Sequence, residues 1–270
     1  MTTVSGLDRD VFIRDGVVCF RGALSGALVD SLREAVEEAM AARQLVDLSA
    51  MARSLGSSAG ASGGFHAGVD HYRSIPAFEA FALRSELPVL IAELLGATSL
   101  YLYEDSVLVK EPNTPQRTEW HQDLGYFHVA GEQICTTWCP LDPATAASGA
   151  VEYVVGSHLW GQVFKPNYFI STQTMTGTAG EKVPAIDGTA HRVVSFDTEP
   201  GDVVVHHART VHGAPGNSSP TLRRRAVSVR YCGDDARVLR RPGAPVKDFQ
   251  TALHDGDELA CGYRNARLTS

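Results

Sequence analysis

The chain has 270 residues, 44% hydrophobic and 20% charged, a composition typical of a globular protein with a sizeable core. It carries 31 acidic and 24 basic residues, and the formal charge of −7 argues against general nucleic-acid binding. No apolar run approaches the roughly 18 residues of a membrane span. The five cysteines form no CxxC pair, and no secretory signal is visible at the start. These features favour a reducing cytoplasm over a disulfide scaffold or a zinc cluster.

The first hundred residues predict mainly helices. Residues 7–22 predict a short helical start, an Asp-Gly turn and a strand. Residues 25–46 have apolar side chains spaced by three and four, which predicts an amphipathic helix with Ser25 as its cap. The Gly- and Ser-rich residues 52–67 predict a flexible loop, and residues 76–97 a further helix with a break or new start at Pro88.

From about residue 99 the chain consists of short β-branched and aromatic runs separated by Gly, Pro and Asp. The runs lie at 99–112, 133–142, 149–158, 201–208 and 224–232. No helices alternate with them, so a parallel α/β sheet is disfavoured. The prediction is a mainly β fold with flanking helices, a double-stranded β-helix (jelly roll, cupin-like) of about eight strands.

We expect one domain over residues 1–270. Its helical N-terminal part, about 1–98, would pack on a jelly-roll core of about 99–235. The turn-rich residues 165–192 predict a long insertion between strands, either a binding lid or a plain surface excursion.

The motif TEWHQD places an imidazole and a carboxylate two residues apart, at His121 and Asp123. In a strand, residues i and i+2 point to the same face, so both side chains can reach one metal ion. His212, in VHGAPGN after the strand GDVVVHHA, is the favoured third ligand, and His206 or His207 is the alternative. Two histidines and one carboxylate form the facial triad of non-haem Fe(II) oxygenases, which leaves open positions on the iron.

An iron centre that activates O2 needs a source of electrons, and 2-oxoglutarate supplies them while chelating the metal. The far carboxylate of 2-oxoglutarate needs a cation, ideally a bidentate arginine. The run LRRRAVSVRY follows His212 closely, and strand alternation places Arg224, Ala226, Ser228 and Arg230 on one face. This alternation favours Arg224 over Arg223 as the clamp, with Ser228 as a hydroxyl partner.

A spaced series of motifs resembles a known family over nearly the whole chain. The motifs are RDGVVCFRGALS, VLVKEPN, TEWHQD, TTWCPLDPATAASGAVEYVVGSHLWG, EPGDVVVHHARTVHGAPGN and RRRAVSVRYCGDDAR. Together they resemble the phytanoyl-CoA dioxygenase (PhyH-like) family of Fe(II)/2-oxoglutarate-dependent oxygenases. The resemblance implies that His121, Asp123 and His212 are the iron ligands. It implies Arg223 as the co-substrate arginine when counted forward from His212, and Arg224 when counted back from AVSVRY.

The resemblance also implies residues around the site. Lys110 and Thr137 match positions beside 2-oxoglutarate, and Trp138 matches a position at the pocket. His158, in the GSH turn, is placed at the substrate pocket, with a mainly structural role as the alternative. Tyr126 is expected there because aromatic residues gather near the ligand motif.

The function implied is hydroxylation of an unactivated C–H bond in a small lipid, acyl or natural-product-like substrate, using Fe(II), 2-oxoglutarate and O2. In related halogenases a small residue replaces the carboxylate, so Asp123 favours hydroxylation. One alternative is desaturation, cyclisation or epimerisation by the same iron chemistry. A second is a jelly-roll binding or sensor protein without catalytic activity. We expect no nucleic-acid or membrane partner.

Overall fold

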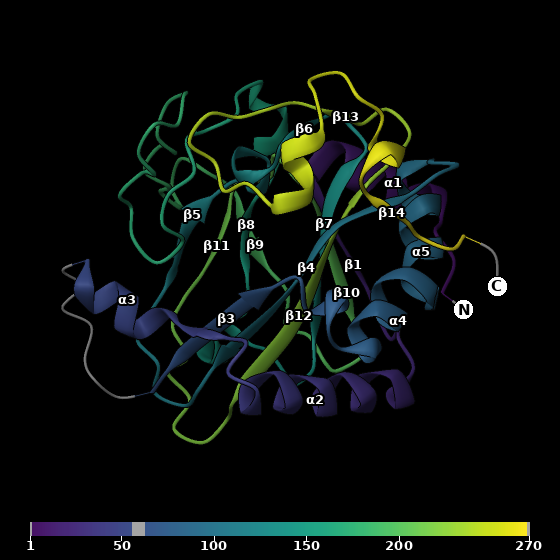
Figure 1. Ribbon diagram of the computed structural model, residues 1–270. Coiled ribbons are helices and arrows are strands. Elements are labelled where there is room, and N and C mark those ends of the chain that lie inside the picture. Colours follow the sequence, from purple (N-terminus) through teal and green to yellow (C-terminus); the bar gives the residue numbers. More distant parts are fainter. Residues whose placement is uncertain (1, 56–62, 269–270) are drawn as a thin grey trace.

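The computed structural model describes residues 2–55 and 63–268, and most of its strands form two antiparallel sheets (Figure 1). The larger sheet contains β1 (Val17–Phe20), β10 (Val203–His207), β7 (Ile134–Pro140), β12 (Arg224–Cys232), β4 (Tyr101–Lys110), β3 (Phe65–Val69) and β2 (Val46–Asp47) in this order, and β14 (Arg264–Asn265) pairs with β4. The smaller sheet has the order β5 (Thr118–His121), β11 (His212–Ala214), β8 (Glu152–Val154) and β9 (Val193–Ser195). A separate pair joins β13 (Arg237–Val238) to β6 (Val129–Ala130).

The two sheets face each other, because one cavity is lined by both. Thr118 and Tyr153 of the smaller sheet share this cavity with Trp138 and Ser228 of the larger sheet. The predicted mainly β jelly roll with flanking helices is therefore confirmed, and its interior contains the candidate site.

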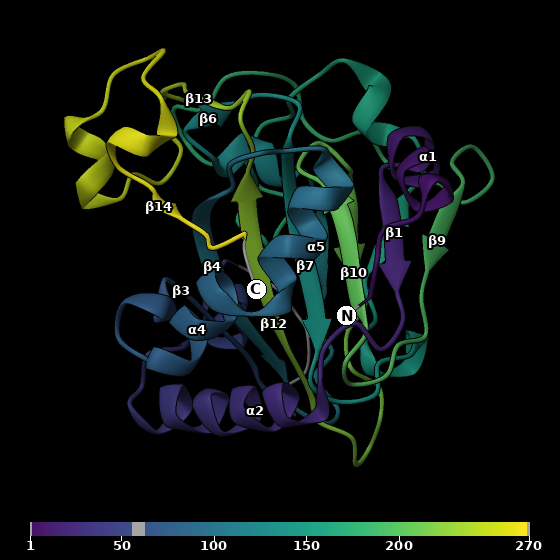
Figure 2. The same cartoon turned by 90° about the vertical axis from the view of Figure 1, so that its right-hand side faces the viewer.

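Helices cover the outer face of the larger sheet (Figure 2). The α-helices are α1 (Gly6–Asp15), α2 (Gly26–Ala41), α3 (Leu48–Ser54), α4 (Pro76–Arg84) and α5 (Glu86–Leu95). Short 3₁₀ turns are η1 (His71–Arg73), η2 (Asp123–Tyr126), η3 (Ala146–Ser148), η4 (Ser157–Trp160), η5 (Asp248–Ala252) and η6 (Leu259–Cys261). Ser25 caps α2 by accepting a hydrogen bond from the backbone N–H of Leu28, as the sequence predicts.

The main core lies between these helices and the sheet. Leu32 of α2 and Phe81 of α4 belong to one buried cluster with Val227, Val229 and Tyr231 of β12. Strand alternation thus commits one face of β12 to the helices, and the opposite face carries Arg224, Ala226, Ser228 and Arg230 toward the cavity. No helix in the described part of the chain is long and apolar enough to cross a membrane.

The N-terminal region differs from its prediction in two places. The helix and strand predicted within residues 7–22 are present as α1 and β1, but β2 and β3, which the sequence did not predict, also pair within the larger sheet. Of the loop predicted over residues 52–67, residues 52–54 belong to α3 and 65–67 to β3, while 56–62 lie outside the described residues. The pattern of the segment FHAGV does not predict a strand, because its alanine and glycine have low β-propensity, which pairing with β4 overrides.

The helix predicted over residues 76–97 is two helices. The break falls at Ser85, whose hydroxyl caps α5 by accepting a hydrogen bond from the backbone N–H of Leu87. Pro88 lies in the first turn of α5, where a missing N–H breaks no helical hydrogen bond. The predicted new start at Pro88 was therefore close to the observed one.

We predict that Phe81→Ala lowers the free energy of unfolding by about 3–5 kcal/mol, because it removes a large side chain from the helix–sheet core. Phe81 is 0% exposed. The matched control is Leu7→Ala, at a side chain 71% exposed, which should change stability by less than about 0.5 kcal/mol. Urea unfolding measures both, and equal midpoints for the two variants would contradict this description of the core.

Candidate metal centre

Two antiparallel strands bring the three predicted ligands together. His121 ends β5, and His212 begins β11 directly opposite it in the strand register. The predicted strand does not continue through Asp123, which opens the turn η2 instead. Gln122 nevertheless keeps an extended backbone, with φ −112° and ψ 141°, so His121 and Asp123 still point to the same side.

The ligand atoms of His121, Asp123 and His212 all lie within 4.8 Å of one another, and all three residues are buried. Asp123 Oδ1 is 3.7 Å from His121 Nε2 and 3.8 Å from His212 Nε2. Each histidine Nδ1 faces a backbone carbonyl, Glu119 O at 2.7 Å and Thr210 O at 2.9 Å respectively. Since a carbonyl only accepts, Nδ1 carries the proton and Nε2 presents its lone pair to the shared centre. This donor set fits Fe(II).

The second carboxylate oxygen of Asp123 has its own partners. Oδ2 accepts a hydrogen bond from Thr136 Oγ1 at 2.5 Å and lies 3.3 Å from His206 Nε2. These contacts hold the carboxylate so that Oδ1 faces the two ligand histidines. His206, the alternative third ligand from the sequence, therefore lies beside the group, whereas His207 points away and contacts Glu132 O at 2.9 Å.

Burial and close packing set the charges of this group. Burial lowers the pKa of His212 well below its usual range, and the neighbouring His121 and His206 reinforce the effect. Burial also lowers the pKa of His206. Burial alone raises the pKa of Asp123, but contacts with the three histidines outweigh it and hold that pKa well below its usual range. Near neutral pH the carboxylate of Asp123 is thus ionised and the imidazoles of His206 and His212 are neutral, and an ionised carboxylate and a neutral imidazole are the forms that bind a metal ion.

Arg224 is buried in the same cavity as the three ligands. Its guanidinium carbon lies 5.7 Å from the centre of the Trp138 ring, and its Nε has no hydrogen-bond partner. Burial lowers the pKa of Arg224 to about 10, so the side chain remains a cation at neutral pH. Among the described residues, no carboxylate forms an ion pair with it. A buried cation without a counter-ion is a site for an anion.

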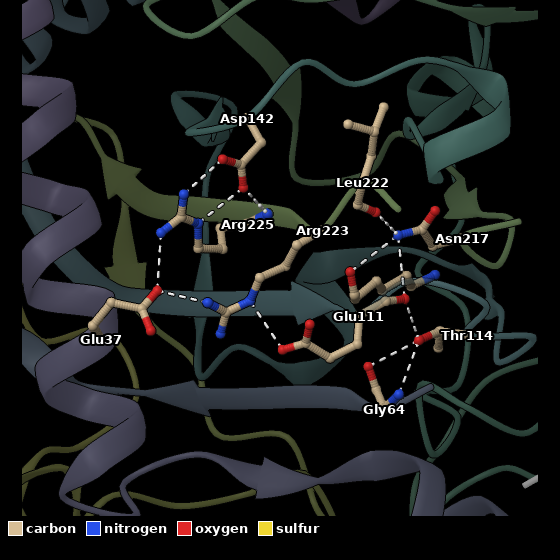
Figure 3. A network of polar contacts seen from close by, with 10 residues as sticks. Glu37, Gly64, Glu111, Thr114, Asp142, Asn217, Leu222, Arg223 and Arg225 are labelled. Carbon is tan, nitrogen blue, oxygen red and sulfur yellow. Dashed lines mark hydrogen bonds and ion pairs between the residues drawn. The ribbon is translucent and has the colours of Figure 1, made fainter. Parts of the chain in front are cut away.

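Arg223, the other arginine candidate, does not line this cavity, and its guanidinium lies between Glu37 and Glu111 (Figure 3). Its guanidinium binds Glu37 at 2.7 Å and Glu111 at 2.9 Å, and the adjacent Arg225 binds Asp142. Glu37 and Glu111 do not line the cavity, so the charge of Arg223 is neutralised outside the cavity.

Lys110 and Thr137 occupy different environments. Lys110 pairs with Arg224 in the β4–β12 register, and its Nζ donates a hydrogen bond to Pro215 O at 2.6 Å. Burial lowers the pKa of Lys110 well below its usual range, and the positive charge of Arg224 adds to this. Thr137 does not line the cavity, because its hydroxyl bonds to the backbone of Val229 in the neighbouring strand. Its expected place at the co-substrate is corrected: Thr136 and Trp138 face the cavity instead.

A second, larger cavity of about 570 Å³ opens beside the metal group. Leu108, His121, Asp123, Phe169 and Arg230 line both cavities. The remaining walls of the larger cavity are mainly apolar and come from residues 46–51, 67–70, 103–106, 126–127 and 245–247. This larger cavity is called the cleft below.

The three residues expected at a substrate pocket have separate locations. Tyr126 lines the cleft, with its ring 5.9 Å from that of His121 and its hydroxyl bonded to Asn167 O. Trp138 lines the smaller cavity beside Arg224. His158 lines neither cavity, because its Nε2 faces Ile13 O of α1 at 3.0 Å. This contact favours the alternative given for His158 above, a mainly structural role.

The structure adds side chains that sequence reasoning did not assign. Thr136 and Tyr153 line the smaller cavity, and Phe169 stands between the two cavities. Thr136 is two residues from Trp138, so strand alternation was a sufficient signal for it. Phe169 comes from the 165–192 segment, which contains no helix or strand, and its ring lies 5.0 Å from that of His121. That segment therefore contributes to the wall of the site.

The jelly roll and its buried His-Asp-His group are those of the non-haem Fe(II) oxygenase class. The sequence profile of the phytanoyl-CoA dioxygenase family (PhyH) matches residues 12–226. The chain belongs to this family.

Individual relatives agree with this assignment. A probable phytanoyl-CoA dioxygenase of Caenorhabditis elegans is 27% identical over 152 residues, covering 54% of this chain and 47% of the relative. A probable alpha-ketoglutarate-dependent hypophosphite dioxygenase of Stutzerimonas stutzeri is 28% identical over 164 residues, covering 58% of this chain and 54% of the relative. The chain thus spans about half the length of these curated relatives.

Among solved structures, the non-haem alpha-ketoglutarate-dependent carbocyclase SnoK from nogalamycin biosynthesis has a similar fold. Its TM-score is 0.74 at 24% identity, covering 98% of this chain and 97% of SnoK. At this identity the likeness supports the shared jelly-roll fold.

We predict that Thr136→Val weakens the binding of Co(II), a stand-in for Fe(II), by about tenfold, because it removes a hydrogen bond that orients Asp123. Thr137→Val is the matched control, since the hydroxyl of Thr137 faces the opposite side of the strand. Calorimetric titration of the metal-free protein measures both affinities. Equal affinity in Thr136→Val and the unmodified protein would contradict the assigned role of this hydroxyl.

Proposed function

We propose that the protein is an Fe(II)/2-oxoglutarate-dependent dioxygenase that hydroxylates an unactivated C–H bond of a small organic substrate. The observation that carries the proposal is the buried guanidinium of Arg224, which shares one enclosed cavity with the His-Asp-His group and lacks a carboxylate partner. An unpaired buried cation beside a metal-binding group suits a co-substrate that has one end on the metal ion and a carboxylate at the other.

In this proposal His121, Asp123 and His212 hold Fe(II), and a facial set of three ligands leaves positions for 2-oxoglutarate and O2. Arg224 binds the far carboxylate of 2-oxoglutarate, with Ser228 on the same strand face as its hydroxyl partner. Lys110 lies beside Arg224 in the strand pairing, and its Nζ donates a hydrogen bond to Pro215 O. We assign no such role to Arg223, since Glu37 and Glu111 already neutralise it.

The chemistry that the bound iron supplies, with 2-oxoglutarate and O2, is oxidation of a C–H bond coupled to formation of succinate and CO2. The protein itself positions the reactants and excludes water. Leu108 and Phe169 form apolar wall between the co-substrate cavity and the cleft. Thr136 and His206 fix the orientation of Asp123, whose presence as a ligand favours hydroxylation.

The cleft is the proposed substrate site. Its volume of about 570 Å³ is within the range of pockets that bind drug-sized molecules, and its walls are mainly apolar. A lipid-like or natural-product-like substrate fits these walls. Because SnoK is a carbocyclase with the same fold, cyclisation by the same iron chemistry is the second candidate, along with desaturation or epimerisation. Product masses distinguish hydroxylation, which adds one oxygen atom, from these outcomes.

We predict that the purified protein with Fe(II) slowly converts 2-oxoglutarate to succinate even without substrate, and that His121→Ala reduces this turnover to background. The reason is the loss of one of the three metal ligands. His254→Ala is the control, because this histidine is exposed and lines neither the metal-site cavity nor the cleft. Succinate formation is measured for all three proteins, and equal turnover in His121→Ala and the unmodified protein would rule out the assigned centre.

We predict that Arg224→Met raises the KM for 2-oxoglutarate by at least about 30-fold, because a buried carboxylate then loses its cation. Arg223→Met should change this KM by less than about threefold, since Arg223 is paired with carboxylates outside the cavity. Initial rates of succinate formation over a range of 2-oxoglutarate concentrations test both variants. A larger rise in this KM for Arg223→Met than for Arg224→Met would instead identify Arg223 as the arginine that binds 2-oxoglutarate.

A further inference from the structure

Four charged side chains form a closed cluster on the wall of the cleft. They are Asp70, Glu104, Arg230 and Lys247, and we call them the cleft ion cluster. Lys247 Nζ lies 2.6 Å from Asp70 Oδ2 and 2.7 Å from Glu104 Oε2, so it bridges both carboxylates. Arg230 Nε lies 3.5 Å from the other oxygen of Glu104. The two negative and two positive side chains of the cluster therefore have a formal net charge of zero.

The cluster is shielded from water. Its side chains are between 11% and 21% exposed, so an added charge there would be screened poorly. Apart from the metal-ligand group, the cleft lining in the described residues contains no further charged side chain. Every lysine or arginine that lines the cleft therefore already has a carboxylate partner.

Arg230 is the member of the cluster nearest the reaction centre, because it lines both the cleft and the cavity with Asp123. One guanidinium nitrogen donates to Ser106 Oγ at 2.6 Å, and Nε faces Glu104. An arginine has five N–H donors, so others remain for an uncharged acceptor such as a carbonyl, ether or hydroxyl oxygen.

Apolar side chains continue from the cleft to its rim. Val46, Val69 and Val246 line it and remain 60%, 56% and 50% exposed respectively. Such an apolar rim is a binding surface for an apolar molecule. An anionic molecule would enter this apolar space and meet only cations that are already paired.

We propose that the cleft selects uncharged, largely apolar molecules over anionic ones, because the carboxylates of the cleft ion cluster already neutralise its cations. This proposal rests on the proposed function for the identity of the reaction, but it concerns binding in the cleft alone. Glu104 is its specificity-determining residue, because its charge neutralises both Lys247 and Arg230.

A pair of fluorescent probes that differ in one charged group tests the proposal. N-phenyl-1-naphthylamine is uncharged, and 1-anilinonaphthalene-8-sulfonate has the same ring system with an added sulfonate. Binding is measured to the full chain, both metal-free and loaded with Ni(II) and 2-oxoglutarate. We expect the uncharged probe to bind at least about tenfold more tightly than the anionic probe.

Glu104→Gln should then strengthen binding of the anionic probe about tenfold and change the uncharged probe less than about threefold, because it releases a cation. Asp70→Asn, which releases Lys247 in part, should act in the same direction. Glu38→Gln is the matched control, because it removes the same charge from an exposed position on α2 and should leave both affinities unchanged.

A second pair of variants locates the probe. Val246→Asp should weaken binding of the uncharged probe at least about tenfold. Leu159→Asp, at an apolar position that is 64% exposed and lies outside the cleft, should not weaken it. The proposal is overturned if the uncharged probe does not bind, if both probes bind equally, or if Glu104→Gln and Glu38→Gln behave alike. Since none of these readings requires turnover, failure of the cleft proposal is separate from failure to form succinate.

Discussion

The strand β12 is the constraint on which the rest of the structure depends. It lies within the larger sheet between β7 and β4, and its side chains point alternately toward the helices and toward the interior of the jelly roll. Val227, Val229 and Tyr231 pack beneath the helices, while Arg224 and Arg230 face the interior. A one-residue slip of this strand would bury arginines in the apolar core and expose valines to the cavity. The stability of the fold and the position of the charged groups are therefore set by the same register.

The second determinant is the pairing of β5 with β11, which places His121 opposite His212. Backbone carbonyls fix the tautomer of both rings, and Thr136 and His206 hold the carboxylate of Asp123. These contacts hold the ligand atoms in orientations that converge on one centre. Arg224 is likewise in place without a carboxylate partner, and this arrangement leaves it available to an anion.

Much of the site follows from local pattern in the sequence. The HxD spacing and the alternation in LRRRAVSVRY depend only on strand geometry, and the structure has Arg224 lining the cavity and Arg223 outside its lining. The strand FHAGV and the wall position of Phe169 depend on pairing and packing between distant segments, which no local pattern reveals. The cleft ion cluster joins residues 70, 104, 230 and 247, so it too required the folded chain. Thr137 shows the limit of the resemblance, since its neighbour Thr136 faces the cavity.

We propose that His121, Asp123 and His212 hold Fe(II) in the cavity where Arg224 binds 2-oxoglutarate. The most direct test is visible absorption under anaerobic conditions, because iron chelated by a 2-oxo acid produces a metal-to-ligand charge-transfer band. The band should appear only when protein, Fe(II) and 2-oxoglutarate are combined, and His212→Ala should abolish it. Absence of the band in the unmodified protein, or an undiminished band in His212→Ala, would contradict iron binding at this centre.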